Sequence, residues 1–523
     1  MWFPLGCFVA CAAIAGAWAL TVPPFDMGDE YSSTVRAEAA GRFHFIPPYE
    51  AENGGGAGPG TVQRYGVFRL PKYVSDWQCF MGHQERLPSC AGPLRVDPSA
   101  IQNTYHGGYP PLYFALVGSA SVIVTGPDGF YAMRLASAVL VAALLALAFD
   151  TAVRDRPRRL LALGVLVAAT PTVFVIGGAV NSSALEVAAA IALWTALLAL
   201  IERRADDPRL PSLIVRATLA AVLLLLARPF SPVWAAVVSV VVAVVAGRTT
   251  TWALLRRRSV QIGCAVFAIA GAAAAAWILL RRPQDDFIRW ANHAPRPGRL
   301  ATAQSVAERT GYFLSGMVGF DGWPGEPTVP PATIATGAVS VVIVAAGAGV
   351  LALVAAAARR TSRHGVMVLG GLVVGVVSAP IVLTALTANT YVENYSAKYT
   401  LPLAVGVPLV AAFLLDQAER LQPHATRLLA AGVVVAFVVA QLALYWTVAH
   451  RFTVGARGPI LYFLDPRWPP RVAASVLLGV VVLAVGWLAS VVGWQAATLS
   501  VPRRASRARA TRSHPSPLPP AGG

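Results

Sequence analysis

Long apolar segments recur from the start of the chain to about Val492, and they limit its fold more than any other feature. Of the 523 residues, 56% are hydrophobic and only 13% are charged, whereas ordinary soluble domains contain about 25% charged residues. A soluble globule is therefore a poor explanation, and the pattern predicts an all-α polytopic membrane protein. We expect about twelve transmembrane helices, over residues 2–22, 128–149, 160–180, 184–201, 211–227, 232–246, 259–280, 333–358, 365–388, 399–415, 428–449 and 471–494.

The basic residues predict which helix ends face the cytoplasm. With both termini inside, the inner connections and the tail hold 21 Arg, and each short outer connection holds at most one basic residue, as the positive-inside rule requires. A further apolar segment, 110–125, is only sixteen residues long and begins with two prolines. If it crossed the membrane, the Arg clusters at 154–159 and 256–258 would lie outside. We therefore predict a helix on the outer membrane surface.

This arrangement divides the chain into one membrane-embedded unit, residues 1–494, and a tail, residues 495–523. The unit has two large outer loops, 23–127 and 281–332, and the Arg- and Pro-rich tail is predicted to be disordered in the cytoplasm. Topology explains the net charge of +17, so we expect no nucleic-acid partner. All but two of the 42 basic residues are Arg, which is typical of a GC-rich bacterial gene, and the expected location is the bacterial plasma membrane.

The cysteine and histidine positions predict a disulfide but no metal site. Cys79 and Cys90 lie in the first outer loop with ten residues between them, in a compartment that favours disulfides. His44, His83 and His106 share that loop, but their spacing matches no metal signature. We predict no metal ligands and no certain cofactor, and we leave a divalent cation open.

An acidic pair follows the first predicted span. Two prolines, Pro23-Pro24, end the span and deliver Asp29 and Glu30 to the outer interface. A partly desolvated carboxylate there could act as a general base. Alternatively, Asp29 could be an N-cap and Glu30 a first-turn acid that complements the helix dipole. The position fits both interpretations.

Ionisable residues within the spans also gather toward the outer side. Glu186 lies in the first turns of the fourth span, and such groups are costly at membrane depth and often mark a site. Basic residues map to the outer ends of four other spans: Arg134, Arg228, Lys398 and Arg451. Together they would suit a lipid-linked phosphate, although each alone could instead reach toward lipid headgroups. In the second outer loop, Asp321 stands beside Trp323, a pairing that could grip a sugar, although Trp323 fits an interfacial aromatic belt equally well.

The order of several short motifs resembles the bacterial membrane proteins of domain-of-unknown-function family 2142, which in turn resemble GT-C superfamily glycosyltransferases. The motifs are Pro23-Pro24 leading to Asp29-Glu30, Tyr109-Pro110-Pro111-Leu112-Tyr113, Tyr131-Ala132-Met133-Arg134-Leu135, Thr170-Pro171 through Asn181 to Glu186, Arg228-Pro229-Phe230-Ser231-Pro232, Lys398-Tyr399-Thr400-Leu401-Pro402, and Arg451 to Gly458-Pro459.

This resemblance covers most of the chain and implies a GT-C-like fold with juxtamembrane helices on the outer surface. It implies that Asp29, alone or with Glu30, is the first-loop catalytic acid. The chain departs from the family pattern at two positions. Ser33 stands where the family usually has His, and Lys398 stands where it usually has Arg, so the chain loses the two-pronged hydrogen bonding that Arg offers a phosphate.

Together these features predict a glycosyltransferase that moves a sugar from a polyprenyl-phosphate donor to an envelope glycan or lipid acceptor. Asp29 would deprotonate the acceptor and Glu30 would position it, while the donor phosphate would bind the four basic residues named above. Membrane lipids are the other expected partners. Two alternatives remain at this stage. One is a transporter or flippase for a lipid-linked saccharide, which would use the same cations and Glu186. The other is a non-catalytic scaffold for envelope assembly.

Overall fold

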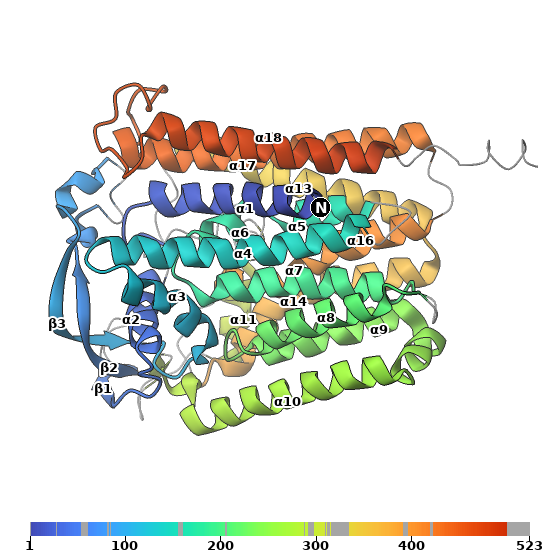
Figure 1. The fold of residues 1–523 in the computed structure, drawn as a ribbon, viewed down its shortest axis with the longest axis horizontal. Helices are drawn as coiled ribbons and strands as arrows, with labels where there is room; N and C mark the ends of the chain where they lie inside the picture. Colours follow the sequence, from blue (N-terminus) through green and yellow to red (C-terminus); the bar gives the residue numbers. More distant parts are fainter. Residues whose placement is uncertain are drawn as a thin grey trace, which may run out of the picture.

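A bundle of long helices makes up most of the molecule (Figure 1). The computed structural model describes residues 2–498, apart from residues 28, 54–60, 81–82, 84, 155–159, 204–206, 287, 291–297, 309, 311–313, 315–333, 391–395 and 419–421. Within these residues, nine helices are long and apolar enough to cross a membrane. They are α1 (Trp2–Thr21), α4 (Asp128–Arg154), α7 (Ser182–Leu200), α9 (Ser231–Leu255), α10 (Arg258–Arg281), α13 (Ile334–Arg360), α14 (Arg363–Thr387), α17 (Pro423–Val454) and α18 (Ala474–Thr498). The protein is thus a multi-pass membrane protein.

The remaining predicted spans correspond to shorter or broken helices. The third is divided into α5 (Leu160–Ala168) and α6 (Pro171–Gly177), which meet at 57°, because Pro171 cannot continue the preceding helix. The fifth is α8 (Leu210–Leu225), and the tenth is α15 (Leu401–Ala404) with α16 (Gly406–Gln417). Each predicted span therefore coincides with apolar helix, but the short helices leave the predicted number of full crossings unconfirmed.

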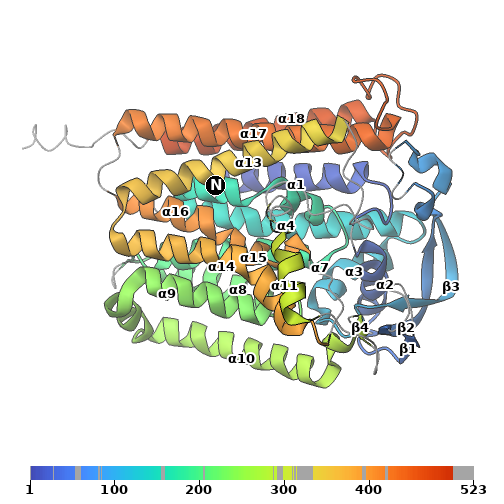
Figure 2. The same cartoon turned by 180° about the vertical axis from the view of Figure 1, so that it is seen from behind.

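A β-sheet covers one end of the bundle, which we call the sheet end (Figures 1 and 2). Its strands β1 (Tyr49–Asn53), β2 (Thr61–Val74) and β3 (Arg95–Thr104) are antiparallel in that order, and β4 (Arg289–Trp290) also pairs with β2. The expectation of an all-α chain omitted this sheet. Its signal was the density of β-branched and aromatic residues from Val62 to Val74, which stands out less than the apolar spans.

The sheet end also contains α2 (Glu30–Gly41) and α3 (Pro111–Ile123), which pack against each other. The segment predicted as a surface helix is α3, and Figures 1 and 2 place it beside α2 and the strands. Although the sequence of α2 is polar, most of the helix is buried. Partners satisfy its long side chains: Arg36 donates to the carbonyls of Phe45 and Tyr109, each at 3.0 Å. This packing fixes the N-terminus of α2, which carries the acidic pair.

Candidate functional site

The backbone at Asp29 turns the carboxylate away from its own helix. Asp29 has φ 65°, a left-handed conformation that Asp tolerates better than most residues. Among the described residues its side chain makes no capping hydrogen bond. Instead, Oδ2 accepts from Lys398 Nζ at 2.6 Å and Oδ1 accepts from the Tyr105 hydroxyl at 2.9 Å. The interpretation of Asp29 as a side-chain N-cap is therefore wrong, and the carboxylate is joined to two distant segments.

Opposing effects act on the ionisation of Asp29. Burial has the largest single effect on the pKa of Asp29 and raises it, but the Lys398 ammonium, His106 and the hydrogen bonds from Lys398 and Tyr105 together lower it more. The net result is a pKa well below the usual range. Asp29 is thus a carboxylate at physiological pH, and both of its oxygens are held as acceptors.

A second cation lies near Lys398. The ring of Tyr399 has the Arg228 guanidinium 4.7 Å from its centroid and Lys398 Nζ at 5.8 Å, distances typical of cation–π contact. Glu186 accepts from Arg228 Nη1 at 3.1 Å and from the Ser231 hydroxyl at 2.7 Å. Arg228 Nε is buried, and within the described part of the chain it has no hydrogen-bond partner. Two cations thus share one neighbourhood, and one of them keeps an unused donor.

A buried imidazole belongs to the same cluster and was not predicted. His106 Nδ1 lies 3.2 Å from Ser33 Oγ, and its ring centroid lies 4.7 Å from that of Tyr105 and 4.4 Å from that of Tyr109. Burial lowers the pKa of His106 to about 3, so the ring is neutral at physiological pH. The one indication in the sequence was Ser33, at the position where the resembling family usually has His.

Glu30 makes a buried ion pair with Arg134, and both side chains have no solvent exposure. Arg134 donates to both Glu30 oxygens, at 2.7 and 2.5 Å. Its remaining three N–H groups donate to the carbonyls of Ala19, Val22 and Pro23. All five guanidinium donors are therefore used within the protein. Arg134 was predicted to bind the donor phosphate, but its donors bind Glu30 and the backbone instead. The pair of Glu30 and Arg134 supports the loop before α2.

Arg451 was also predicted to bind the donor phosphate, but in the structure it binds backbone carbonyls. Its guanidinium donates to carbonyls of the first loop: Phe80, His83 and Arg86. Cys79 and Cys90 are joined by a disulfide that closes this same segment, with Cα atoms 6.1 Å apart. Arg451 thus fastens the end of α17 to the disulfide loop, and in the described residues it makes no hydrogen bond or ion pair with Asp29 or Lys398.

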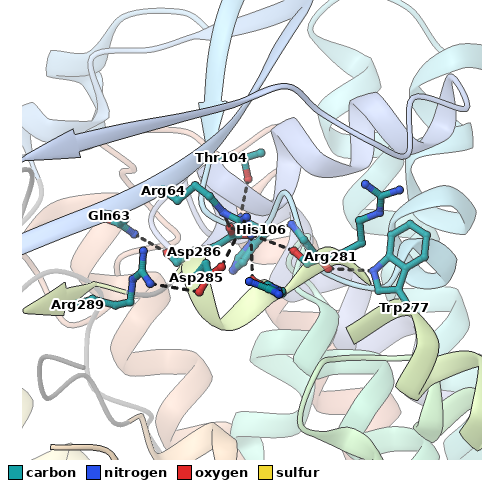
Figure 3. Close-up of polar contacts among 11 residues, drawn as sticks. Gln63, Arg64, Thr104, His106, Trp277, Arg281, Asp285, Asp286 and Arg289 are labelled. Atoms are coloured by element: carbon teal, nitrogen blue, oxygen red, sulfur yellow. Dashed lines mark hydrogen bonds and ion pairs between the residues drawn. The ribbon is translucent and has the colours of Figure 1, made fainter. Parts of the chain in front are cut away.

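The second large loop contributes acids other than the predicted Asp321, which lies outside the described residues. Asp286, in the short helix η3 (Pro283–Asp286), accepts from Arg64 Nε and from the Gly108 backbone N–H, both at 2.7 Å. Figure 3 shows this group beside His106. Burial is the main cause that raises the pKa of Asp286 to about 6. These contacts join β2, η3 and the segment before α3, and so fix the position of His106.

No metal centre is found among the residues that the structure describes, where no group of three His, Cys, Asp or Glu side chains could hold an ion. An apolar groove of about 370 Å³ lies between α3, α10 and the end of α8. Its lining includes Pro110, Leu226, Ala274 and Trp277. Pro110 in this lining follows Tyr109, whose ring lies 5.9 Å from the Arg228 guanidinium, so adjacent residues link the groove to the cationic cluster.

Several solved structures and one family of membrane proteins are similar to this chain. No curated protein matches it. Among solved structures, the crystal structure of ArnT from Cupriavidus metallidurans in the apo state is 14% identical, with a TM-score of 0.44 over 94% of this chain and 76% of that one. The structure of ArnT from Cupriavidus metallidurans bound to undecaprenyl phosphate is 13% identical, with a TM-score of 0.43 and the same coverage.

The family described as "Predicted membrane protein (DUF2142)" matches residues 13–407. The matched region contains the acidic pair, Glu186, both cations of the cluster and the imidazole beside them. Because this match spans most of the chain, the protein belongs to the DUF2142 family of membrane proteins.

Proposed function

We propose that the protein is a membrane glycosyltransferase of the GT-C type, which transfers a sugar from a polyprenyl-phosphate donor to a hydroxyl group of an envelope glycan or lipid. One observation carries the proposal: the partly buried Asp29 carboxylate lies 2.6 Å from Lys398, next to a second cation, Arg228. A base for the acceptor and positive charge for a leaving phosphate thus lie together at the end of a membrane bundle.

Arg228 and Lys398 are the residues proposed to bind the donor phosphate. Glu186 and Ser231 hold Arg228 in place, and its buried Nε is available for an anion. Charge-assisted bonds to phosphate are among the stronger hydrogen bonds in proteins. The predicted phosphate roles of Arg134 and Arg451 are replaced here by supporting roles, because their guanidinium groups are bound to Glu30 and to backbone carbonyls.

The apolar groove beside the cluster is proposed to hold part of the isoprenoid chain. Its walls come from α3, α10 and the end of α8, and their side chains offer almost no polar group. Ligand sites of this kind combine an apolar wall with a few polar groups that fix orientation. With the phosphate at Arg228, the first isoprene units would enter the groove past Pro110.

The reaction would be a single displacement at the anomeric carbon. Asp29 takes the proton of the acceptor hydroxyl as its oxygen forms a bond to the sugar C1. The bond between C1 and the phosphate oxygen breaks, and its electron pair leaves with the polyprenyl phosphate. Arg228 and Lys398 stabilise the negative charge that develops on this leaving group. Glu30 acts through Arg134 by fixing the loop that carries Asp29.

This proposal places the sheet end outside the bacterial plasma membrane, with both termini in the cytoplasm. Its test is analysis of envelope glycans in a deletion strain complemented with wild type, Asp29→Asn or Asp207→Asn. Asp207 pairs with Arg203 in the connection between α7 and α8, at the opposite ends of these helices from Glu186 and Arg228, and serves as a matched control. We expect wild type and Asp207→Asn to restore the glycan, and Asp29→Asn to reduce transfer about 100-fold or more.

A second arm of the experiment uses purified protein in lipid vesicles, so that insertion and folding are checked by protease resistance and thermal unfolding. If folded Asp29→Asn transfers sugar as fast as wild type, Asp29 is not the base. If it restores the envelope glycan fully in cells, the transporter or scaffold interpretation is favoured instead.

A further inference from the structure

The contact between Asp29 and Lys398 poses a chemical conflict within the proposed function. Lys398 donates to one Asp29 oxygen at 2.6 Å and Tyr105 donates to the other at 2.9 Å, so both oxygens of the proposed base are already stabilised by a donor. A carboxylate so well stabilised as an anion is a weak base, because the drive to take a proton falls with the pKa of the base. Asp29 therefore becomes a stronger base when it loses one of these donors.

We infer that Lys398 is shared between Asp29 and the donor phosphate, so that donor binding withdraws Lys398 from Asp29 and turns the carboxylate into an effective base. This inference rests on the proposed function, and it adds an order of events: the base becomes effective only when the donor is in place.

Of the two partners of Asp29, Lys398 is the one able to move. Tyr105 packs edge-on against His106, which is anchored at Ser33, and so its hydroxyl is held by a fixed ring. Lys398 instead carries its ammonium on four rotatable methylene groups with three donors. It belongs to the short 3₁₀ helix η4 (Ala397–Tyr399).

The neighbourhood of Lys398 provides a place for the competing anion. Arg228 lies against the same Tyr399 ring, and Glu186 and Ser231 hold it there. We take a phosphate bound to Arg228 to lie within reach of Lys398, because the two cations lie 4.7 and 5.8 Å from the centroid of one ring. It carries at least the charge of a carboxylate and offers more acceptor oxygens, so it is an effective competitor for the ammonium.

The other ionisable groups that act on Asp29 cannot replace Lys398. They are Tyr105, whose pKa burial raises well above the usual value, and His106, whose pKa burial lowers to about 3. Both are neutral at physiological pH. Removal of Lys398 from Asp29 therefore removes the main positive charge acting on the carboxylate, and its proton affinity rises.

The competing interpretation is a permanent ion pair that only stabilises the fold. Buried pairs of this kind are destabilising to break, because the remaining charge is left without a partner. The two interpretations predict opposite effects of neutralising Asp29. A permanent pair predicts a destabilised protein with no gain in phosphate binding, whereas a shared Lys398 predicts tighter binding, because the carboxylate no longer competes for it.

The test measures binding of undecaprenyl phosphate to the full-length protein in detergent. We expect Asp29→Asn to bind it about tenfold more tightly than wild type, a size typical of coupling between linked sites. Lys398→Met should bind more weakly than wild type, and the double variant should bind like Lys398→Met, without any gain from Asp29→Asn. Asp207→Asn should match wild type.

Each outcome decides something. If folded Asp29→Asn binds no more tightly than wild type, the sharing of Lys398 is refuted, although the proposed donor survives. If wild type itself does not bind undecaprenyl phosphate, the donor proposal fails, and the inference fails with it. If Asp29→Asn does not fold, infrared spectra of wild type test the sharing of Lys398 instead. They are recorded near pH 4, which is close to the ordinary pKa of Asp. The protonated-carboxyl band should grow on lipid addition in wild type but not in Lys398→Met, and equal growth in both would refute the inference.

Discussion

Asp29 and Glu30 are neighbours in sequence but differ sharply in environment. The left-handed backbone at Asp29 separates their side chains. Glu30 joins Arg134, whose five donors all bind protein groups, whereas Asp29 joins Lys398, whose ammonium donates to Asp29 alone among the residues that the structure describes. Of these two adjacent acids, Glu30 thus has a fixed structural partner, whereas Asp29 has a partner that it can exchange. This division follows from their contacts and not from residue type.

The sequence predicted the residues of the candidate site better than their contacts. Asp29, Glu186, Arg228 and Lys398 were expected at one end of the bundle, since charged groups at the ends of apolar spans are conspicuous. Their pairing depends on residues far along the chain; Lys398, for example, is 369 positions from Asp29. The buried His106 was missed because a single histidine in a polar loop has no distinguishing pattern.

At the residue scale, the neutral state of His106 predicts a pH dependence of stability. Its pKa is about 3 in the folded protein and about 6.5 in an unfolded chain. As the pH falls from about 6.5 toward 3, the unfolded chain takes up a proton that the folded protein does not, so stability falls. We expect the melting temperature in detergent to drop less over this window in His106→Asn than in wild type. The exposed His44 gives the control His44→Asn, and equal slopes in all three proteins would contradict the assignment.

At the scale of elements, the site depends on a close crossing of α2 and α3. A Cβ atom added at Gly118 would lie 1.9 Å from the Ala37 carbonyl oxygen, and one added at Gly41 would lie 2.4 Å from the Gly118 carbonyl carbon. The two backbones are thus in direct contact. In the sequence, Gly118 merely interrupts the apolar segment 110–125, and its packing role depends on which helix lies opposite.

This crossing predicts that Gly118→Ala destabilises the protein. The added methyl group must push α2 and α3 apart, and overpacking of this kind costs about 1–3 kcal/mol. Because α2 begins at the acidic pair, the proposed transfer activity should fall as well. Thermal unfolding in detergent measures the first effect. Gly271→Ala in α10, where a Cβ meets nothing within 4 Å, should be neutral or slightly stabilising, and equal melting temperatures of both variants would contradict the prediction.

At the scale of the whole molecule, the apolar pattern predicted the helical architecture, and a helix occurs at each expected span. The β-sheet was not predicted, because its strands form through pairing of segments whose signal is weaker than that of the spans. Helix length affects the number of crossings as well. The helix α8, and the pair α15 and α16 taken together, are shorter than the helices that are long enough to cross a membrane. Composition thus determines the class of fold, whereas pairing and breaks depend on contacts between distant segments.

The predicted sidedness can be measured with single cysteines. Ser99 is exposed on β3 at the sheet end, and Thr249 is exposed near the end of α9, which lies at the opposite end of the bundle (Figure 1). With Cys264 replaced by Ser, we expect a membrane-impermeant maleimide to label Ser99→Cys in right-side-out vesicles and Thr249→Cys in inside-out vesicles. The reverse pattern would place the sheet end in the cytoplasm and would remove the basis for envelope chemistry.

The separation of 369 positions between Asp29 and Lys398 in the sequence also has a consequence for biosynthesis. The ribosome has to synthesise about three-quarters of the polypeptide before Lys398 emerges. Asp29 is therefore inserted at the membrane well before its partner exists. Until then, the nascent chain cannot bind a lipid phosphate through this pair, so the order of translation delays the formation of the proposed site.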